Sequence, residues 1–103
     1  MHTIKHLEKN IHCEYEDAEK YIKLAMKCKD LGDTDLAKLY HELAEEEIKH
    51  AERLHSMAVK IIKSIPEDKK PPAGMLEFYN LLHERDMEEA KEVEILMDLY
   101  EGG

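Results

Sequence analysis

Residues 14–51 read EYEDAEKYIKLAMKCKDLGDTDLAKLYHELAEEEIKHA, and this stretch decides the fold. Residues 31–34, in its middle, read LGDT. Glycine commonly ends a helix because it adopts a left-handed backbone without steric cost, and Asp33 and Thr34 are candidate N-caps of a following helix. The sequence on both sides of this break keeps a helical period and contains no proline. The stretch therefore predicts two helices joined by a short turn.

The hairpin extends outward until it meets a proline-rich break. Residues 64–74 read SIPEDKKPPAG, and the three prolines remove backbone donors and disfavour helix in the residues before them. We expect a helical hairpin over about residues 3–64, a linker over about residues 65–73 and a third helix over about residues 74–100. The 103 residues are thus expected to form one all-α domain that is one helix short of a four-helix bundle.

Composition excludes several classes of protein. The chain has 15 Lys and Arg against 24 Asp and Glu, a formal net charge of −9. This balance disfavours binding to nucleic acid or to an anionic membrane surface, since both require a surplus of basic residues. No apolar run is long enough to span a bilayer. Residues 1–14 are charged throughout and lack an apolar signal core, so a cytoplasmic protein is expected.

Cysteine usage indicates no disulfide. Cys13 and Cys28 both fall on the first expected helix, roughly 22 Å apart along its axis. A disulfide needs Cα atoms within about 7 Å, so we expect two free thiols.

Apolar residues recur at alternating steps of three and four along both helices of the hairpin, and we call each such series a seam. The first seam is Ile4, Leu7, Ile11, Glu14, Ala18, Tyr21, Ala25 and Cys28; the second is Leu36, Tyr40, Leu43, Glu47, His50, Leu54, Met57 and Ile61. Ionisable residues interrupt both seams near the middle. Glu14 lies 18 residues before Gly32, and His50 lies 18 residues after it. Antiparallel helices therefore place these side chains at one level, inside an otherwise apolar interface.

Such a convergence favours a metal ion, because burying an unpaired carboxylate costs several kcal/mol. Glu47 and His50 are three residues apart and share one helix face, so both can bind one ion together with Glu14. Carboxylate and imidazole ligands suit iron, with manganese and zinc as the alternative metals. A Glu facing an E-x-x-H motif is the recurring di-iron arrangement of four-helix bundles. Glu45 and Glu46 are rival ligands, but they lie beside the seam and are expected in solvent.

The same stretch resembles the first helical hairpin of rubrerythrin-type ferritin-like proteins. The matching positions are Glu14, Tyr21, Ala25, Gly32, Ala37, Tyr40, Ala44, Glu45, Glu47, His50 and Ala51. The resemblance implies a di-iron site in which Glu14 and Glu47 bridge or chelate iron and His50 is a terminal ligand.

Two departures from rubrerythrins are informative. The third expected helix contains no second E-x-x-H, and the Cys-rich rubredoxin-like tail is absent. In these respects the chain looks more like the encapsulated ferritins, in which hairpins from two chains complete a four-helix bundle with iron at the dimer interface. The resemblance thus implies a homodimer or a larger ring. No apolar cargo tail follows Tyr100, so an encapsulin shell is not indicated.

The third helix has a seam of its own, which Asp86 and Glu89 interrupt. It comprises Met75, Tyr79, Leu82, Asp86, Glu89, Val93, Leu96 and Tyr100. The two acids either add ligands to the site or line an ion entrance, or, as the pattern favours, lie in solvent or at a subunit contact.

Other candidate residues receive plainer interpretations. Tyr21 and Tyr40 lie two turns from Glu14 and Glu47 on the same seams, and they are expected in the core, with a hydrogen bond behind the ligands or radical quenching as the alternative role. Six histidines lack positions on the first two seams and are expected at the surface or at subunit contacts; they are His2, His6, His12, His41, His55 and His83.

The favoured function is ferroxidase chemistry, in which Glu14, Glu47 and His50 carry the oxidation of Fe²⁺ by O₂ or peroxide. Peroxide reduction at the same site, a non-enzymatic metal-binding module and a purely structural helical oligomer remain the alternatives.

Overall fold

Three long helices run along one axis and build the whole fold. The computed structural model describes residues 2–70 and 72–102. Its elements are α1 (His2–Asp30), α2 (Thr34–Ser64), the 3-10 helix η1 (Glu67–Lys69) and α3 (Ala73–Gly102). The part of the chain that is described contains no strand, and its extents are 58 × 18 × 17 Å. The all-α prediction is confirmed, and the predicted limits of the hairpin and of the third helix lie within two residues of the observed ends.

The turn between α1 and α2 forms as its sequence predicts. Gly32 has a φ of 83°, the left-handed conformation that glycine adopts most readily. Its N–H donates to the carbonyl of Lys29 at 3.1 Å, and the next N–H, from Asp33, donates to Cys28 at 2.9 Å. These two bonds make a Schellman motif, which satisfies the last carbonyls of α1. The Asp33 side chain then caps α2 by accepting from the Leu36 N–H at 3.2 Å.

The α1–α2 contact is built on small side chains at seven-residue spacing. We call the buried row on α2 the alanine strip; it consists of Ala37, Ala44, Ala51 and Ala58. The row on α1 that meets it is Ile4, Ile11, Ala18 and Ala25. A seven-residue repeat keeps one strip of each helix facing its partner. Because alanine adds so little volume, the two backbones approach closely along the whole hairpin.

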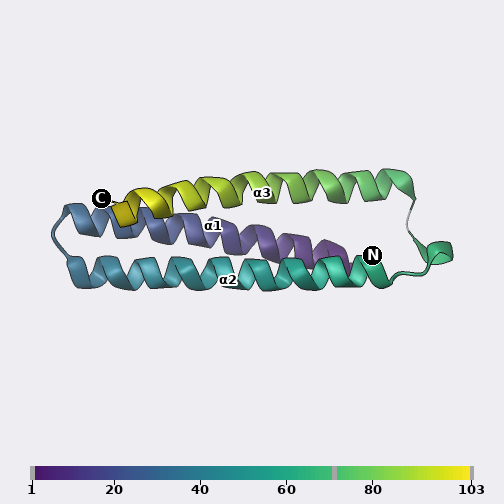
Figure 1. Cartoon of the computed structure of the whole chain (residues 1–103), viewed down its shortest axis with the longest axis horizontal. Helices are drawn as coiled ribbons and strands as arrows, with labels where there is room; N and C mark the ends of the chain where they lie inside the picture. The colour runs from purple at the N-terminus through teal and green to yellow at the C-terminus, as the bar shows by residue number, and fades with distance from the viewer. Residues whose placement is uncertain (1, 71, 103) are drawn as a thin grey trace.

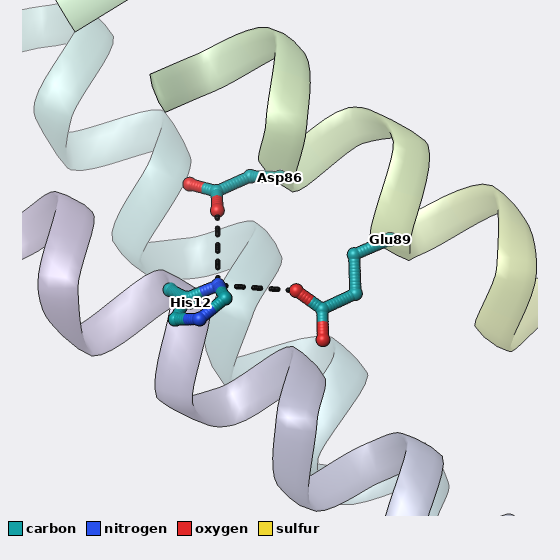
Figure 2. A group of neighbouring side chains, drawn as sticks. All are labelled: His12, Asp86 and Glu89. Carbon is teal, nitrogen blue, oxygen red and sulfur yellow. Dashed lines mark ion pairs between the residues drawn. The ribbon is translucent and has the colours of Figure 1, made fainter. Parts of the chain in front are cut away.

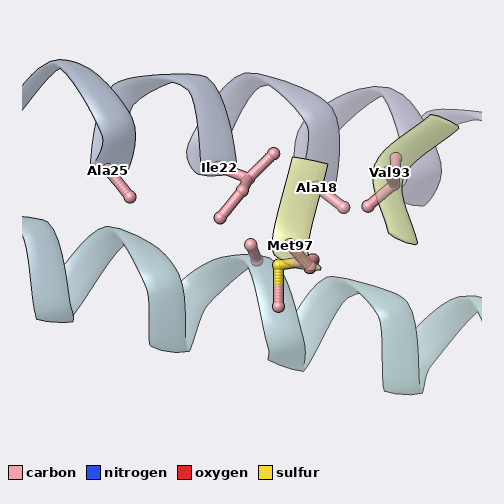
Figure 3. Packing of buried hydrophobic residues seen from close by; sticks show 6 residues of the cluster. Ala18, Ile22, Ala25, Val93 and Met97 are labelled. Atoms are coloured by element: carbon pink, nitrogen blue, oxygen red, sulfur yellow. The ribbon is translucent and has the colours of Figure 1, made fainter. Parts of the chain in front are cut away.

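α3 runs along one flank of this hairpin (Figure 1), where it packs most closely on α1 and also reaches α2, as the stacked rings of His55 and His83 show. Three members of the predicted third-helix seam, Tyr79, Asp86 and Val93, are buried, whereas Met75 is 44% exposed. The largest apolar cluster joins all three helices and consists of Ala18, Ile22, Ala25, Ala44, Val93 and Met97 (Figure 3).

The linker, the two cysteines and the apolar character of the helices can also be compared with the sequence-based expectations. The linker contains η1, a short helix that the sequence analysis did not predict. Cys13 and Cys28 are free thiols, as predicted. Within residues 2–70 and 72–102, no helix combines the length and apolar character that a membrane span requires.

Close approach along the alanine strip predicts a specific sensitivity to side-chain size. We expect Ala44→Leu to lower the free energy of unfolding by about 1–3 kcal/mol, because Ala44 is fully buried and the added carbons force the helices apart. Urea unfolding at fixed protein concentration measures the change. Lys38→Leu is the control, since it places the same side chain on the exposed side of α2. Equal stability of the two variants would contradict close packing along the strip.

Candidate metal centre

Glu14 on α1 faces Glu47 and His50 on α2, and we call these three residues the Glu14 triad. One ligand atom from each residue lies within 4.8 Å of the other two. Glu14 Oε2 is 3.4 Å from His50 Nδ1, and Glu47 Oε1 is 3.9 Å from the same nitrogen. The equal arm lengths on either side of Gly32 account for this meeting, since they bring the side chains to one level of the hairpin.

The triad lies on the open flank of the hairpin, which corrects the expected interior position. The side chains of Glu14, Glu47 and His50 are 26%, 19% and 51% exposed. Glu14 follows Ile11 by three residues, so it points to the edge of the helix contact, beside the buried strip. His50 and Glu14 also line a shallow groove of about 470 Å³ whose other lining residues are Arg53, Leu54 and Met57. None of these residues belongs to α3, which covers the opposite flank.

The two carboxyl groups of the triad repel each other unless a positive charge joins them. Hydrogen bonding to Glu14, with burial and the negative charge of Glu14, raises the pKa of Glu47 to about 7. Glu14 Oε2 is buried and accepts no hydrogen bond of good geometry, although His50 Nδ1 lies 3.4 Å away. An orphaned carboxylate oxygen, a second carboxylate and an imidazole nitrogen at one point form a donor set that fits a divalent iron, manganese or zinc ion.

The rival ligands lie elsewhere. Glu45 Oε1 is 3.1 Å from His41 Nδ1, so it pairs along its own helix, and Glu46 is exposed. Tyr21 and Tyr40 stack with ring centroids 6.1 Å apart and pack against the largest apolar cluster. Their positions agree with the core interpretation.

A second group of ligand-type residues lies on the covered flank, and we call it the His12 cluster. It joins His12 of α1 to Asp86 and Glu89 of α3 (Figure 2). Asp86 and Glu89 thus face inward and do not reach the Glu14 triad, and the solvated position that the sequence favoured is wrong for Asp86, which is 1% exposed. Burial, followed by hydrogen bonding to Asp86, raises the pKa of Glu8 to about 7 beside this cluster.

Four of the histidines that were expected at the surface or at subunit contacts are partly buried against another helix of the same chain. They are His12, His41, His55 and His83. His41 contacts Glu45 and Glu101, and the His55 and His83 rings stack at 4.6 Å. His6 is exposed, and the His2 side chain lies outside the described part of the chain.

Sequence reasoning missed Glu8 and His12. A usable signal was present, because Glu8, Tyr15 and Ile22 form a second seven-residue row on α1 beside the one that meets the alanine strip. That row marks the face that α3 covers, and His12 lies next to it.

The rubrerythrin family model matches residues 5–101. The chain belongs to the rubrerythrin family. The match extends the resemblance from the hairpin to nearly the whole chain, α3 included. No curated protein and no solved structure matches the chain. Rubrerythrin membership indicates a ferritin-like di-iron protein and agrees with the donor set of the Glu14 triad.

The crowded carboxylates of this rubrerythrin-family chain predict an unusual pH dependence of stability. The folded-state pKa of Glu47, about 7, lies above its ordinary value of 4.5, so the folded protein binds the proton more tightly than the unfolded chain. The stability that this group contributes is therefore present below pH 4.5 and is lost as the pH rises through about 7. We expect metal-free protein to unfold at lower urea concentration at pH 7.5 than at pH 5, and Glu47→Gln to reduce that difference. The raised pKa of Glu8 affects the stability of the wild type and of the variant equally, so the difference in pH dependence between the two proteins reports on Glu47. If the stability of the wild type and of the variant depends on pH to the same extent, Glu47 and Glu14 do not interact in the folded protein as described.

Proposed function

We propose that this rubrerythrin-family chain supplies half of a di-iron centre and that two chains together oxidise Fe²⁺. The observation that carries the proposal is a half-set of ligands on an open flank. Ferritin-like di-iron sites use a Glu from each of two helices and a Glu-x-x-His from each of two others. On the open flank one hairpin offers one Glu and one Glu-x-x-His. The second Glu-x-x-His of α2, residues 52–55, has its histidine stacked on His83 of α3, and α3 itself contains no such motif. A second hairpin supplies what is missing.

The surroundings of the triad support a partner chain on the same flank. Leu36 and Met57, which lie on the second seam on either side of the ligands, are 38% and 48% exposed. A second copy packed on this flank by two-fold symmetry would bury these side chains and bring its own Glu14, Glu47 and His50 to the same level, because a two-fold contact presents one surface to itself. The proposed assembly is therefore a homodimer, alone or within a larger ring.

Each residue of the triad has a definite task in this proposal. Glu14 and Glu47 bind Fe²⁺ and offset its charge, and Glu47 releases its proton when the ion arrives, since ligands must be deprotonated. His50 binds as the neutral imidazole. Carboxylate ligands favour Fe³⁺ over Fe²⁺ because they offset the higher charge more effectively, which assists the loss of an electron from each substrate ion to O₂ or peroxide.

The catalytic assignment predicts a selective loss of activity. We expect Glu47→Ala to slow Fe²⁺ oxidation at least about tenfold, because the adjacent ion loses a carboxylate ligand. Fe³⁺ formation is followed by absorbance, with O₂ and hydrogen peroxide tested as oxidants in separate experiments. The matched control is Glu46→Ala, which removes an exposed carboxylate one residue away and should leave the rate unchanged. Equal rates in the two variants would exclude the Glu14 triad as the oxidation site. If the wild type binds metal stoichiometrically but oxidises Fe²⁺ with neither oxidant, the chain is a non-enzymatic metal-binding protein.

The half-site also predicts that metal drives association of the chains. We expect Zn²⁺, which has no redox chemistry, to lower the dimer dissociation constant of the wild type about tenfold or more in sedimentation equilibrium. Glu47→Ala should not respond, and Glu46→Ala should respond like the wild type. A wild-type chain that stays monomeric with Zn²⁺ across the micromolar range would rule out completion of the site by a second copy.

A further inference from the structure

The His12 cluster contains a buried carboxylate that its protein surroundings do not satisfy. Asp86 is 1% exposed, and neither of its two buried carboxylate oxygens accepts a well-formed hydrogen bond from a nitrogen or a hydroxyl group; its hydrogen-bonding neighbour is another carboxyl group, that of Glu8. Leaving an ionised carboxylate in this state costs several kcal/mol, and native proteins rarely do so without a charged partner. Asp86 lies between α1 and α3, so any such partner belongs in that contact.

The neighbouring side chains converge on the same point. His12 Nδ1 lies 3.6 Å from Asp86 Oδ1 and 3.1 Å from Glu89 Oε2. Figure 2 shows both carboxyl groups pointing from α3 toward the His12 ring on α1. His12 Nδ1 is itself buried without a hydrogen bond of good geometry. A nitrogen and two carboxylate oxygens, all within 4.8 Å of one another, thus face a common centre.

Glu8 adds a third acid to this region. It lies one helical turn before His12 on α1, is 7% exposed and has a buried Oε2 without a hydrogen-bond partner. A protonated His12 brings a single positive charge, which is too little for the carboxyl groups of Glu8, Asp86 and Glu89. The excess of negative donors requires a further cation or bound protons.

The other nitrogen of the His12 ring is placed as metal-binding histidines require. His12 Nε2 contacts the Glu16 carboxylate on the solvent side. Histidine ligands usually donate their second ring N–H to a carboxylate, which fixes the tautomer and directs the free nitrogen at the metal. Here that arrangement directs Nδ1 at Asp86 and Glu89.

We propose that His12, Asp86 and Glu89 bind one divalent transition-metal ion between α1 and α3, with Glu8 as an additional carboxylate beside it. One imidazole with several carboxylates suits Zn²⁺, Fe²⁺ or Mn²⁺ better than Ca²⁺ or Mg²⁺. The His12 side chain is 29% exposed, which leaves the ion a way in from solvent. The site lies entirely within one chain and shares no residue with the Glu14 triad, so it does not depend on the proposed dimer. Its ion links α3 to a helix far away in sequence and holds the third helix on the hairpin.

Zn²⁺ binding in a Glu47→Ala background tests the site without the triad. After treatment with chelator and removal of the chelator, we expect about one Zn²⁺ per chain by elemental analysis after gel filtration, and a rise in Tm of about 5 °C or more at saturating Zn²⁺. Adding Asp86→Asn should abolish both, because it keeps the size of the side chain and removes its charge. Adding Glu88→Gln, a neutralisation of an exposed acid two residues away, should preserve both.

A purely structural ion pair gives a different result. It predicts that the Glu47→Ala protein binds no stoichiometric Zn²⁺, or that Asp86→Asn leaves the Zn²⁺ response intact, and either outcome overturns the proposal. Co²⁺ provides a second readout, since its visible absorption bands should appear in the Glu47→Ala protein and disappear on adding His12→Gln. Because His12 is more exposed than Asp86, this variant also keeps the test open if Asp86→Asn does not fold.

Discussion

The close contact along the alanine strip is the constraint on which the rest of the structure depends. It joins α1 to α2 through one narrow row of side chains on each helix, so both flanks of the hairpin remain available. On α1, the row of Glu8, Tyr15 and Ile22 on one flank receives α3. Glu14 stands on the other flank and meets His50 there. Had larger side chains filled the strip, the helices would lie farther apart and Glu14 could not reach the ligands on α2.

Much of this arrangement follows from short-range rules. The turn at Gly32, the cap at Asp33 and the proline-rich linker are local signals, and the structure confirms all of them. The level at which Glu14 meets Glu47 and His50 was also predictable, because it depends only on counting residues from the turn. The burial of these side chains could not be predicted in the same way. A seam read in steps of three and four includes residues of two neighbouring rows, one buried and one at the edge of the helix contact. Ala18 belongs to the buried row, while Glu14 belongs to the row at its edge.

The sequence pattern could not predict which face of α3 packs on the hairpin, and the reason is physical. This helix carries apolar residues on more than one side, and five of the large ones stay exposed; they are Met75, Phe78, Leu81, Ile95 and Leu99. A helix with two apolar faces does not indicate which one packs inward. The meeting of His12 with Asp86 depends on that choice and on a contact between distant parts of the chain, so a local pattern could not reveal it. The consequence is that one turn of α1 sends His12 to the covered flank and Glu14 to the open one.

The seven-residue repeat of the strip has a consequence for alignment. A repeat of identical small residues packs almost equally well after a slide of one repeat, about 10 Å along the axis. The strip therefore holds the helices together without distinguishing one alignment from the next. The tight turn at Gly32 fixes the alignment, because so short a connection does not allow α2 to shift along α1. Glu14 therefore lies opposite His50 because a glycine at the far end of the hairpin removes every other alignment.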